Sequence, residues 1–219
     1  AALRSRRRTR TAARTRALPT PARMNPSPLP PRERALALMH QYVDSESLRR
    51  HMYAVEAACR AYARQYGEDE ELYGLAGLLH DMDYEKRPDE HPLVAAELLR
   101  EHGYPEELVH AVLAHNAYRT GVQPETLLDR TLHACDEVTG LITAAALVRP
   151  SRALYDLEAK SVLKKFKDRA FAAGVDREDV QQAAAALGVE LKAHVQFVIE
   201  AMRSVAPALG LEGTEGPAT

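Results

Sequence analysis

The chain has no tryptophan, few other aromatic residues and no long apolar run. Its 219 residues include only three phenylalanines and nine tyrosines, while alanine and leucine abound. No apolar run approaches the roughly 20 residues that a membrane-spanning helix needs, which argues against a membrane protein. Alanine and leucine favour close-packed helices, and a chain that is 46% hydrophobic and 27% charged suits one medium-sized soluble domain with a sizeable core.

Cysteine is almost as scarce. The two cysteines, Cys59 and Cys135, form no CxxC motif. Both fall on helix faces predicted to point inward, so we interpret them as small, reduced core residues of a cytoplasmic protein. Glycine-rich phosphate loops, Ser-His-Asp arrangements and internal repeats are also missing.

Acidic residues are missing from the first 23 positions, which hold eight of the 29 lysines and arginines. The remainder carries 21 basic against 31 acidic residues, a net charge of −10, which argues against a nucleic-acid partner. The basic segment is typical of a nucleic-acid arm, of an Arg-rich targeting peptide, or of translated sequence upstream of a true start at Met24, and we favour the last. We expect a disordered tail over 1–31, one folded domain over 32–209 and a flexible tail over 210–219.

Three helices are expected to present metal-capable side chains to the core. Apolar residues recur at three- and four-residue steps over 44–66 and over 124–148, which predicts amphipathic helices with His51 and Asp136 on their inward faces. A third apolar run over 72–79 ends at His80 and Asp81, where adjacent side chains can both turn toward one point.

These side chains predict a metal site. A buried carboxylate costs several kcal/mol unless it is paired or bound to a cation, and no arginine or lysine on these faces is available for Asp81 and Asp136. Two imidazoles and two carboxylates suit Mn, Fe, Co, Ni or Zn better than Ca. We therefore expect His51, His80, Asp81 and Asp136 to hold one divalent ion with open positions.

The order His51, His80-Asp81, Asp136 on successive helices resembles the HD-domain superfamily of metal-dependent phosphohydrolases, and the stretch from about Leu48 to Leu209 is similar to a bacterial branch of it. The stretches that carry the resemblance are GLLHDMDYEKRPDEHP, LLREHG, VLAHN, CDEVTGLITAAALVRPS, KSVLKKFKDRAFAAGVDRED and FVIEAM. The resemblance implies an all-α HD-domain helical bundle and a divalent metal cofactor, with Mg as a further candidate.

Two further histidines, His91 and His115, fall where two-metal relatives of this superfamily place ligands for a second ion. Both lie at predicted helix ends, from which they can reach a cleft. A second ion, a phosphate contact and a pair of surface imidazoles all remain open for them. His40, His102, His110, His133 and His194 are interpreted as surface or packing residues.

The function that this resemblance implies is hydrolysis of a small phosphorylated metabolite, with a nucleotide favoured. Asp81 or Asp83 would orient the attacking water or take its proton. A di-iron oxygenase on the same scaffold and a non-catalytic metal or ligand sensor are the alternatives. The common HDIG motif takes the form His80-Asp81-Met82-Asp83 in this chain, and no GYP motif follows it, which argues against a cyclic-di-GMP substrate. Tyr84-Glu85 stands where alarmone hydrolases carry Glu-Asp, which argues against an alarmone substrate.

A basic strip follows the helix of Asp136, and much of 148–173 is expected to be helical. Charge runs are usually solvated faces, but we expect some of these residues to reach a phosphate near the metal. The candidates are Arg149, Lys164, Lys165 and Lys167. A helix from the N-cap Asp176 to Gly188 and another over 190–205 are expected to close the bundle.

Overall fold

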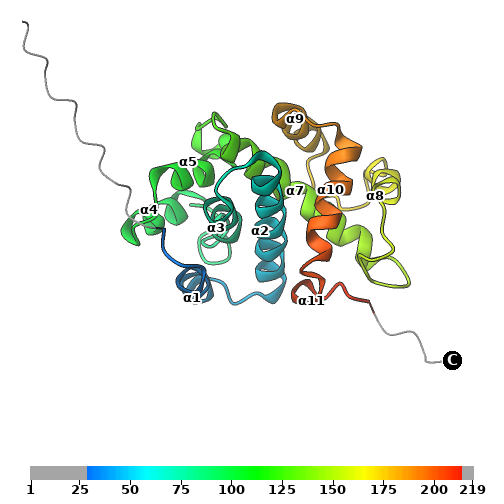
Figure 1. The fold of residues 1–219 in the computed structure, drawn as a ribbon, viewed down its shortest axis with the longest axis horizontal. Coiled ribbons are helices and arrows are strands. Elements are labelled where there is room, and N and C mark those ends of the chain that lie inside the picture. Colours follow the sequence, from blue (N-terminus) through cyan, green and yellow to red (C-terminus); the bar gives the residue numbers. More distant parts are fainter. Residues whose placement is uncertain (1–28, 214–219) are drawn as a thin grey trace, which may run out of the picture.

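The computed structural model describes residues 29–213, and within this range every regular element is a helix (Figure 1). The prediction of an all-α bundle is confirmed. The helices are α1 Arg32–Tyr42, α2 Glu46–Tyr66, α3 Glu70–Leu79, α4 Leu93–Glu101, α5 Glu106–Ala114, α6 Ala117–Thr120, α7 Leu127–Leu147, α8 Ala159–Phe166, α9 Arg177–Leu187, α10 Leu191–Arg203 and α11 Ala206–Leu209. None of these helices is long and apolar enough to cross a membrane.

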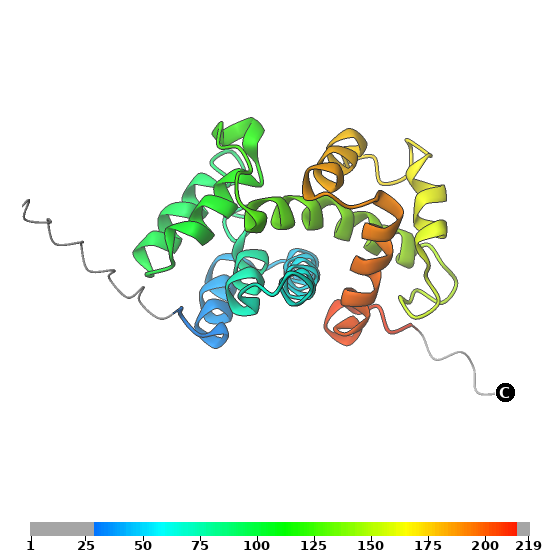
Figure 2. The same cartoon turned by 45° about the horizontal axis from the view of Figure 1, so that its top comes forward.

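The long helix α7 runs through the middle of the described part of the molecule (Figure 2). Helices α2, α3 and α5 form one group that packs against α7, and α8, α9 and α10 form a second group that packs against it. Helix α2 also contacts α10 and α11, so the two groups share one apolar core. This arrangement brings the middle of α7 close to the ends of α3 and α5.

Side-chain caps set where the two longest helices begin. Ser45 accepts a hydrogen bond from the backbone of Leu48, so α2 begins at Glu46 rather than at Asp44. Thr126 and Asp129 form a capping box at the start of α7, which therefore begins after residue 126 rather than at Pro124. The left-handed Gly67 ends α2, as a glycine after a helix commonly does.

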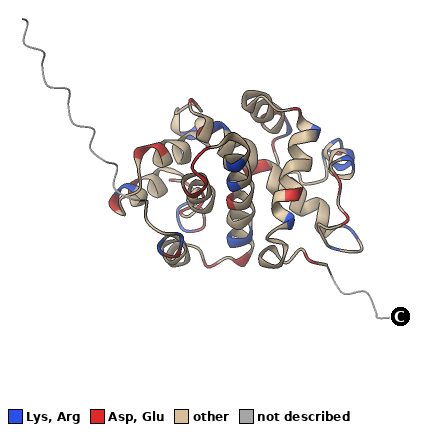
Figure 3. Cartoon of the chain, viewed as in Figure 1, with Lys and Arg blue, Asp and Glu red and all other residues tan. Residues whose placement is uncertain are grey.

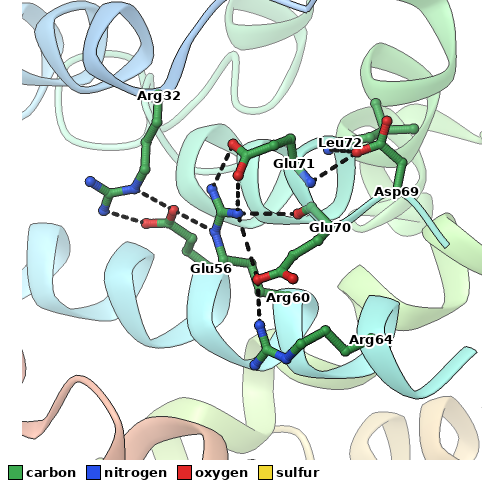
Figure 4. A network of polar contacts seen from close by, with 8 residues as sticks. All are labelled: Arg32, Glu56, Arg60, Arg64, Asp69, Glu70, Glu71 and Leu72. Carbon is green, nitrogen blue, oxygen red and sulfur yellow. Dashed lines mark hydrogen bonds and ion pairs between the residues drawn. The ribbon is translucent and has the colours of Figure 1, made fainter. Parts of the chain in front are cut away.

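Helix α3 lies unusually close to α2 because residue 77 has no side chain. A Cβ at Gly77 would come within 2.8 Å of the backbone nitrogen of Glu56, so only glycine allows this approach. An ion network holds the same two helices and α1 together (Figure 4). Arg32 and Arg60 both bind the buried Glu56, and Arg60 also binds Glu71 at 2.7 Å.

The region after α7 departs from the prediction. Only Ala159–Phe166 of the 148–173 stretch is regular α-helix, because Leu154 instead bonds the carbonyl of Leu211 at 3.0 Å. Leu211 is buried, so the packed part of the chain reaches two residues beyond the expected end of the domain at residue 209. Residues 1–28 and 214–219, which include most of the expected tails, lie outside the described residues. Both cysteines are buried and free, as expected.

Candidate metal centre

Four expected ligands come from three helices to one place. His51 projects from α2 and Asp136 from the middle of α7, while His80 and Asp81 follow directly after the last residue of α3. Because regular α-helix ends at Leu79 and a turn begins, the adjacent side chains of His80 and Asp81 can face the same point.

The distances between their ligand atoms suit one small ion. His51 Nε2 lies 3.0 Å from Asp136 Oδ1 and 3.6 Å from Asp81 Oδ2. His80 Nε2 lies 3.4 Å and 3.5 Å from the same two oxygens. Ligand bonds of about 2.1 Å in tetrahedral or octahedral geometry separate neighbouring ligand atoms by about 3.0–3.4 Å. The cluster therefore has the spacing that such an ion requires.

One buried nitrogen in this cluster has no hydrogen-bond partner. His80 Nδ1–H donates to the carbonyl of Gly77 at 2.8 Å, which leaves the lone pair on Nε2. That Nε2 is fully buried and unpartnered, and it faces the two carboxylates. A buried polar atom without a partner is costly, and a metal ion would satisfy this one. The donor set thus fits a divalent transition ion.

The electrostatics of the cluster point the same way. Burial opposes a charge on His80, but the carboxylates of Asp81 and Asp136 outweigh it and raise the pKa of His80 to about 10. Burial would likewise raise the pKa values of Asp81 and Asp136, yet the neighbouring histidines, His80 foremost, lower both. The carboxylates stabilise positive charge at His80 Nε2, where a metal ion would compete with the proton.

His91 and His115 also reach this cluster. His91 Nε2 lies 3.3 Å from Asp81 Oδ1 and 3.2 Å from His115 Nε2, which itself lies 3.7 Å from Asp81 Oδ1. His115 Nδ1–H donates to the carbonyl of Val112, so its Nε2 is free to bind a ligand. Asp81 therefore turns one oxygen to His51 and His80 and the other to His91 and His115, so it would be able to contribute to two ion sites.

A cavity of about 570 Å³ opens onto these residues. Across from the ligands, its wall carries Glu137 of α7 and Asp176 and Asp179 at the start of α9, while the exposed Tyr84 and Tyr118 also line it. No lysine or arginine among the described residues lines this cavity. Any anionic group that binds here must therefore find its positive charge on imidazoles or on a bound ion.

Several residues of this wall were not predicted from the sequence to lie at the site. His133, expected to be a surface or packing residue, lies one turn before Asp136 on α7 and binds Asp179 at 2.9 Å, which raises its pKa. His133 is three residues before Asp136, and this helical spacing could have indicated that the two side chains lie on the same face of α7. Burial, reinforced by Asp136 and Asp179, raises the pKa of Glu137 to about 7. No local pattern places α9 opposite α7.

Comparison with known proteins agrees with this geometry. The family model described as HD domain matches residues 48–141, the stretch from α2 to the middle of α7. The uncharacterized protein MJ0778 of Methanocaldococcus jannaschii is 31% identical over 121 residues, which cover 53% of this chain and 70% of that protein. The chain belongs to the HD-domain family. Members of this family are metal-dependent phosphohydrolases, and HD domains bind divalent metals.

Other similar proteins are much longer than this HD protein. Ribonuclease Y of Desulfotalea psychrophila is 30% identical over 145 residues, which cover 63% of this chain and 26% of the relative. Ribonuclease Y of Lawsonia intracellularis is 33% identical over 107 residues, 47% of this chain and 20% of the relative. The chain thus spans about a quarter or less of these relatives. No solved structure gives a significant match.

Asp83 of the HD protein does not lie where the sequence analysis expected it. Its side chain is fully buried behind His91 and does not line the cavity. Oδ1 accepts a hydrogen bond from His91 Nδ1 at 2.7 Å, and Oδ2 accepts one from the backbone of Ala95 at 2.7 Å. With both oxygens engaged, Asp83 cannot take a proton from water in the cavity. It instead orients His91 so that Nε2 faces Asp81.

The basic strip does not reach the site either. Arg149 bonds the carboxylate of Asp156 at 2.7 Å, and Lys165 Nζ lies 4.9 Å from the centre of the Phe171 ring. Lys164 and Lys167 are exposed around α8, at the far end of α7 from α5 (Figures 1 and 3). None of the four lines the cavity at the ligands, so the structure does not bring them together with the candidate metal centre.

Proposed function

We propose that this HD protein is a metal-dependent hydrolase of a small phosphorylated metabolite, with a nucleotide as the favoured class. The observation that carries the proposal is the unpartnered, fully buried Nε2 of His80, which faces the carboxylates of Asp81 and Asp136 beside an open cavity. His51, His80, Asp81 and Asp136 would hold one divalent ion, Mn, Fe, Co, Ni, Zn or Mg. His91 and His115 would hold a second, with Asp81 between the two.

The charges in this site indicate what a metal ion and what the side chains would each contribute. A divalent ion, when bound, supplies Lewis acidity toward a phosphoryl oxygen and lowers the pKa of water. Because no lysine or arginine lines the cavity, the chain itself provides only imidazoles to offset the charge of a phosphate. Of the two carboxylates first considered for the water's proton, only Asp81 faces the cavity, so it is the one that would orient the water.

Several relatives are named Ribonuclease Y, which makes an RNA phosphodiester a further candidate substrate. The wall of Glu137, Asp176 and Asp179 argues against it, because its basic neighbour His133 is already paired with Asp179 and no arginine or lysine lines the cavity, so each added phosphate of a chain would meet carboxylates. A small substrate whose phosphate lies at the metal ligands avoids this repulsion. We therefore favour a monoester over a polyanion.

A di-iron oxygenase is the second candidate, and one observation favours it. The two oxygens of Asp81 face two separate imidazole pairs, which is how a carboxylate bridges a pair of irons. Oxygen consumption with two bound irons would select this function. Metal binding without turnover of any substrate would select a sensor.

The deciding experiment compares the parent protein with Asp136→Asn, and with Asp44→Asn as a control in an exposed carboxylate away from the cluster. Each is loaded with one of the six metals and assayed for phosphate release from glycerol phosphate and nucleoside phosphates, and for monoester formation from cyclic diesters. We expect Asp136→Asn to lose metal and turnover at least tenfold each, because a neutral amide is a poor ligand. If Asp136→Asn keeps full metal content and turnover, the site lies elsewhere.

A further inference from the structure

A second cavity adjoins the metal-ligand cavity, and the two share His51 and Gly140. The second one has a volume of about 470 Å³ and lies between α2, the end of α7 and the segment from α11 to Leu211. Gly140 lies one turn after Asp136 on α7, so the boundary between the cavities is directly beside a metal-ligand position.

Nothing in the backbone or the packing requires glycine at position 140. The residue lies inside a long helix and is not among the glycines with positive φ. An ideal Cβ there would meet no heavy atom within 4 Å, in contrast to Gly77, where it would strike the neighbouring helix. Glycine inside a helix is less stable than alanine. Because Gly140 lines both cavities, no side chain of residue 140 stands between them.

The two cavities differ in charge. The metal-ligand cavity is walled by Glu137, Asp176 and Asp179. The second cavity has an apolar wall of Leu147, Leu209 and Leu211, with the polar side chains of Ser47 and Thr143 on its helices.

Its charged groups largely offset each other, because Arg50 forms an ion pair with Glu46. An uncharged organic group with a few hydrogen-bonding atoms suits the second cavity better than it suits the carboxylate wall.

We propose that a substrate phosphate binds at the metal ligands while its organic group crosses Gly140 into the second cavity, and that residue 140 limits the size of this group. The inference rests on the proposed function and narrows its substrate class to monoesters of a bulky, largely uncharged alcohol such as a nucleoside. A volume of about 470 Å³ lies within the range of cavities that hold such ligands.

The test measures binding by calorimetry to the metal-loaded protein, with two probes: inorganic phosphate, and the non-hydrolysable phosphonate analogue of adenosine 5′-monophosphate as the nucleotide. Phosphate reports the metal ligands alone, and the nucleotide adds the organic group. We expect the parent to bind the nucleotide at least tenfold tighter than phosphate. Gly140→Leu should abolish that preference and leave the phosphate Kd within twofold, while Gly140→Ala should keep most of the preference.

Two matched variants locate the organic group. Ala144 lines only the second cavity and Ala117 only the first, so Ala144→Leu should lower the preference for the nucleotide over phosphate at least fivefold, whereas Ala117→Leu should leave that preference within twofold. The reverse result, or a parent that binds the nucleotide no tighter than phosphate, would overturn the inference. Phosphate release is assayed separately. If the protein prefers the nucleotide over phosphate but hydrolyses no phosphate ester, the proposed function is wrong while the inference about the second cavity holds.

Discussion

At the scale of single residues, Asp83 shows how a carboxylate acts through a neighbour. It receives hydrogen bonds from His91 Nδ1 and from the backbone of Ala95. The first of these bonds fixes the proton on Nδ1 and leaves Nε2 free toward Asp81. Asp83 is thus a positioning residue of the candidate metal centre rather than a group that handles the water.

We predict that Asp83→Asn weakens metal binding at His91 and His115 by about 10- to 100-fold, the usual effect of losing such a partner. An amide oxygen can satisfy only one of the two donors, and an amide N–H facing His91 favours the tautomer that has no lone pair on Nε2. The measurement is calorimetric titration of metal into the metal-free protein, where the weaker of two binding steps should change. Unchanged affinities in both steps would contradict this role.

At the scale of helices, a buried histidine ties α2, α7 and α10 together. His194 of α10 accepts a hydrogen bond from the Tyr62 hydroxyl at 2.6 Å through Nδ1, while Nε2–H donates to the carbonyl of Ala134 at 2.8 Å. Neutral imidazole satisfies both partners, and burial lowers the pKa of His194. A protonated ring would lose its acceptor and would carry a buried charge.

This contact predicts that acid weakens the fold. The unfolded chain takes up a proton at residue 194 near pH 6.5, whereas the folded protein resists it, so stability falls as pH drops below 6.5 toward the lower native pKa. The loss is at most about 1.4 kcal/mol per pH unit for this one group. His133 and His80, whose pKa values are raised, act in the opposite sense.

The contribution of His194 to this pH dependence is measured by comparing urea unfolding of the parent and of His194→Gln at pH 7.5 and at pH 5.5. We expect the variant to be less stable at pH 7.5 by about 1–3 kcal/mol, because a buried partner loses its hydrogen bond. It should also lose less stability on acidification than the parent. An equal loss in both proteins would show that His194 does not contribute to the pH dependence.

At the scale of the whole molecule, charge is arranged in separate regions. The basic residues of 160–169 lie around α8 (Figure 3). The carboxylates of Glu137, Asp176 and Asp179 instead line the cavity at the metal ligands. A phosphate therefore finds its positive charge at the candidate metal centre rather than on a basic surface.

The separation predicts that single neutral substitutions of Arg149, Lys164, Lys165 and Lys167 leave kcat/KM within about twofold of the parent at matched metal content. A direct, charge-assisted contact to a phosphate would instead cost about 1.5–3 kcal/mol, or more than tenfold. Steady-state kinetics on the best substrate decides between the two. A tenfold loss of kcat/KM on substitution of one of the four would show that this residue does bind the substrate.

Much of this protein is already determined by local sequence. The apolar spacing in α2 and α7 predicts which faces are buried, and burial of His51, His80, Asp81 and Asp136 without a neutralising base predicts that they meet. Helix caps such as Asp176 and stops such as Gly188 are equally local, because one side chain or one φ angle decides them.

Other features depend on how the helices pack. Asp83 and Asp81 are two residues apart, yet one is enclosed behind His91 and the other faces the cavity, a difference set by the positions of α4 and α5. The basic strip follows α7 in sequence but does not lie at the metal ligands, because α7 continues from Asp136 to Leu147 before the strip begins. Likewise, only the packing of α9 against α7 brings Asp179 to His133. Such contacts join residues far apart in the chain, and no local periodicity encodes them.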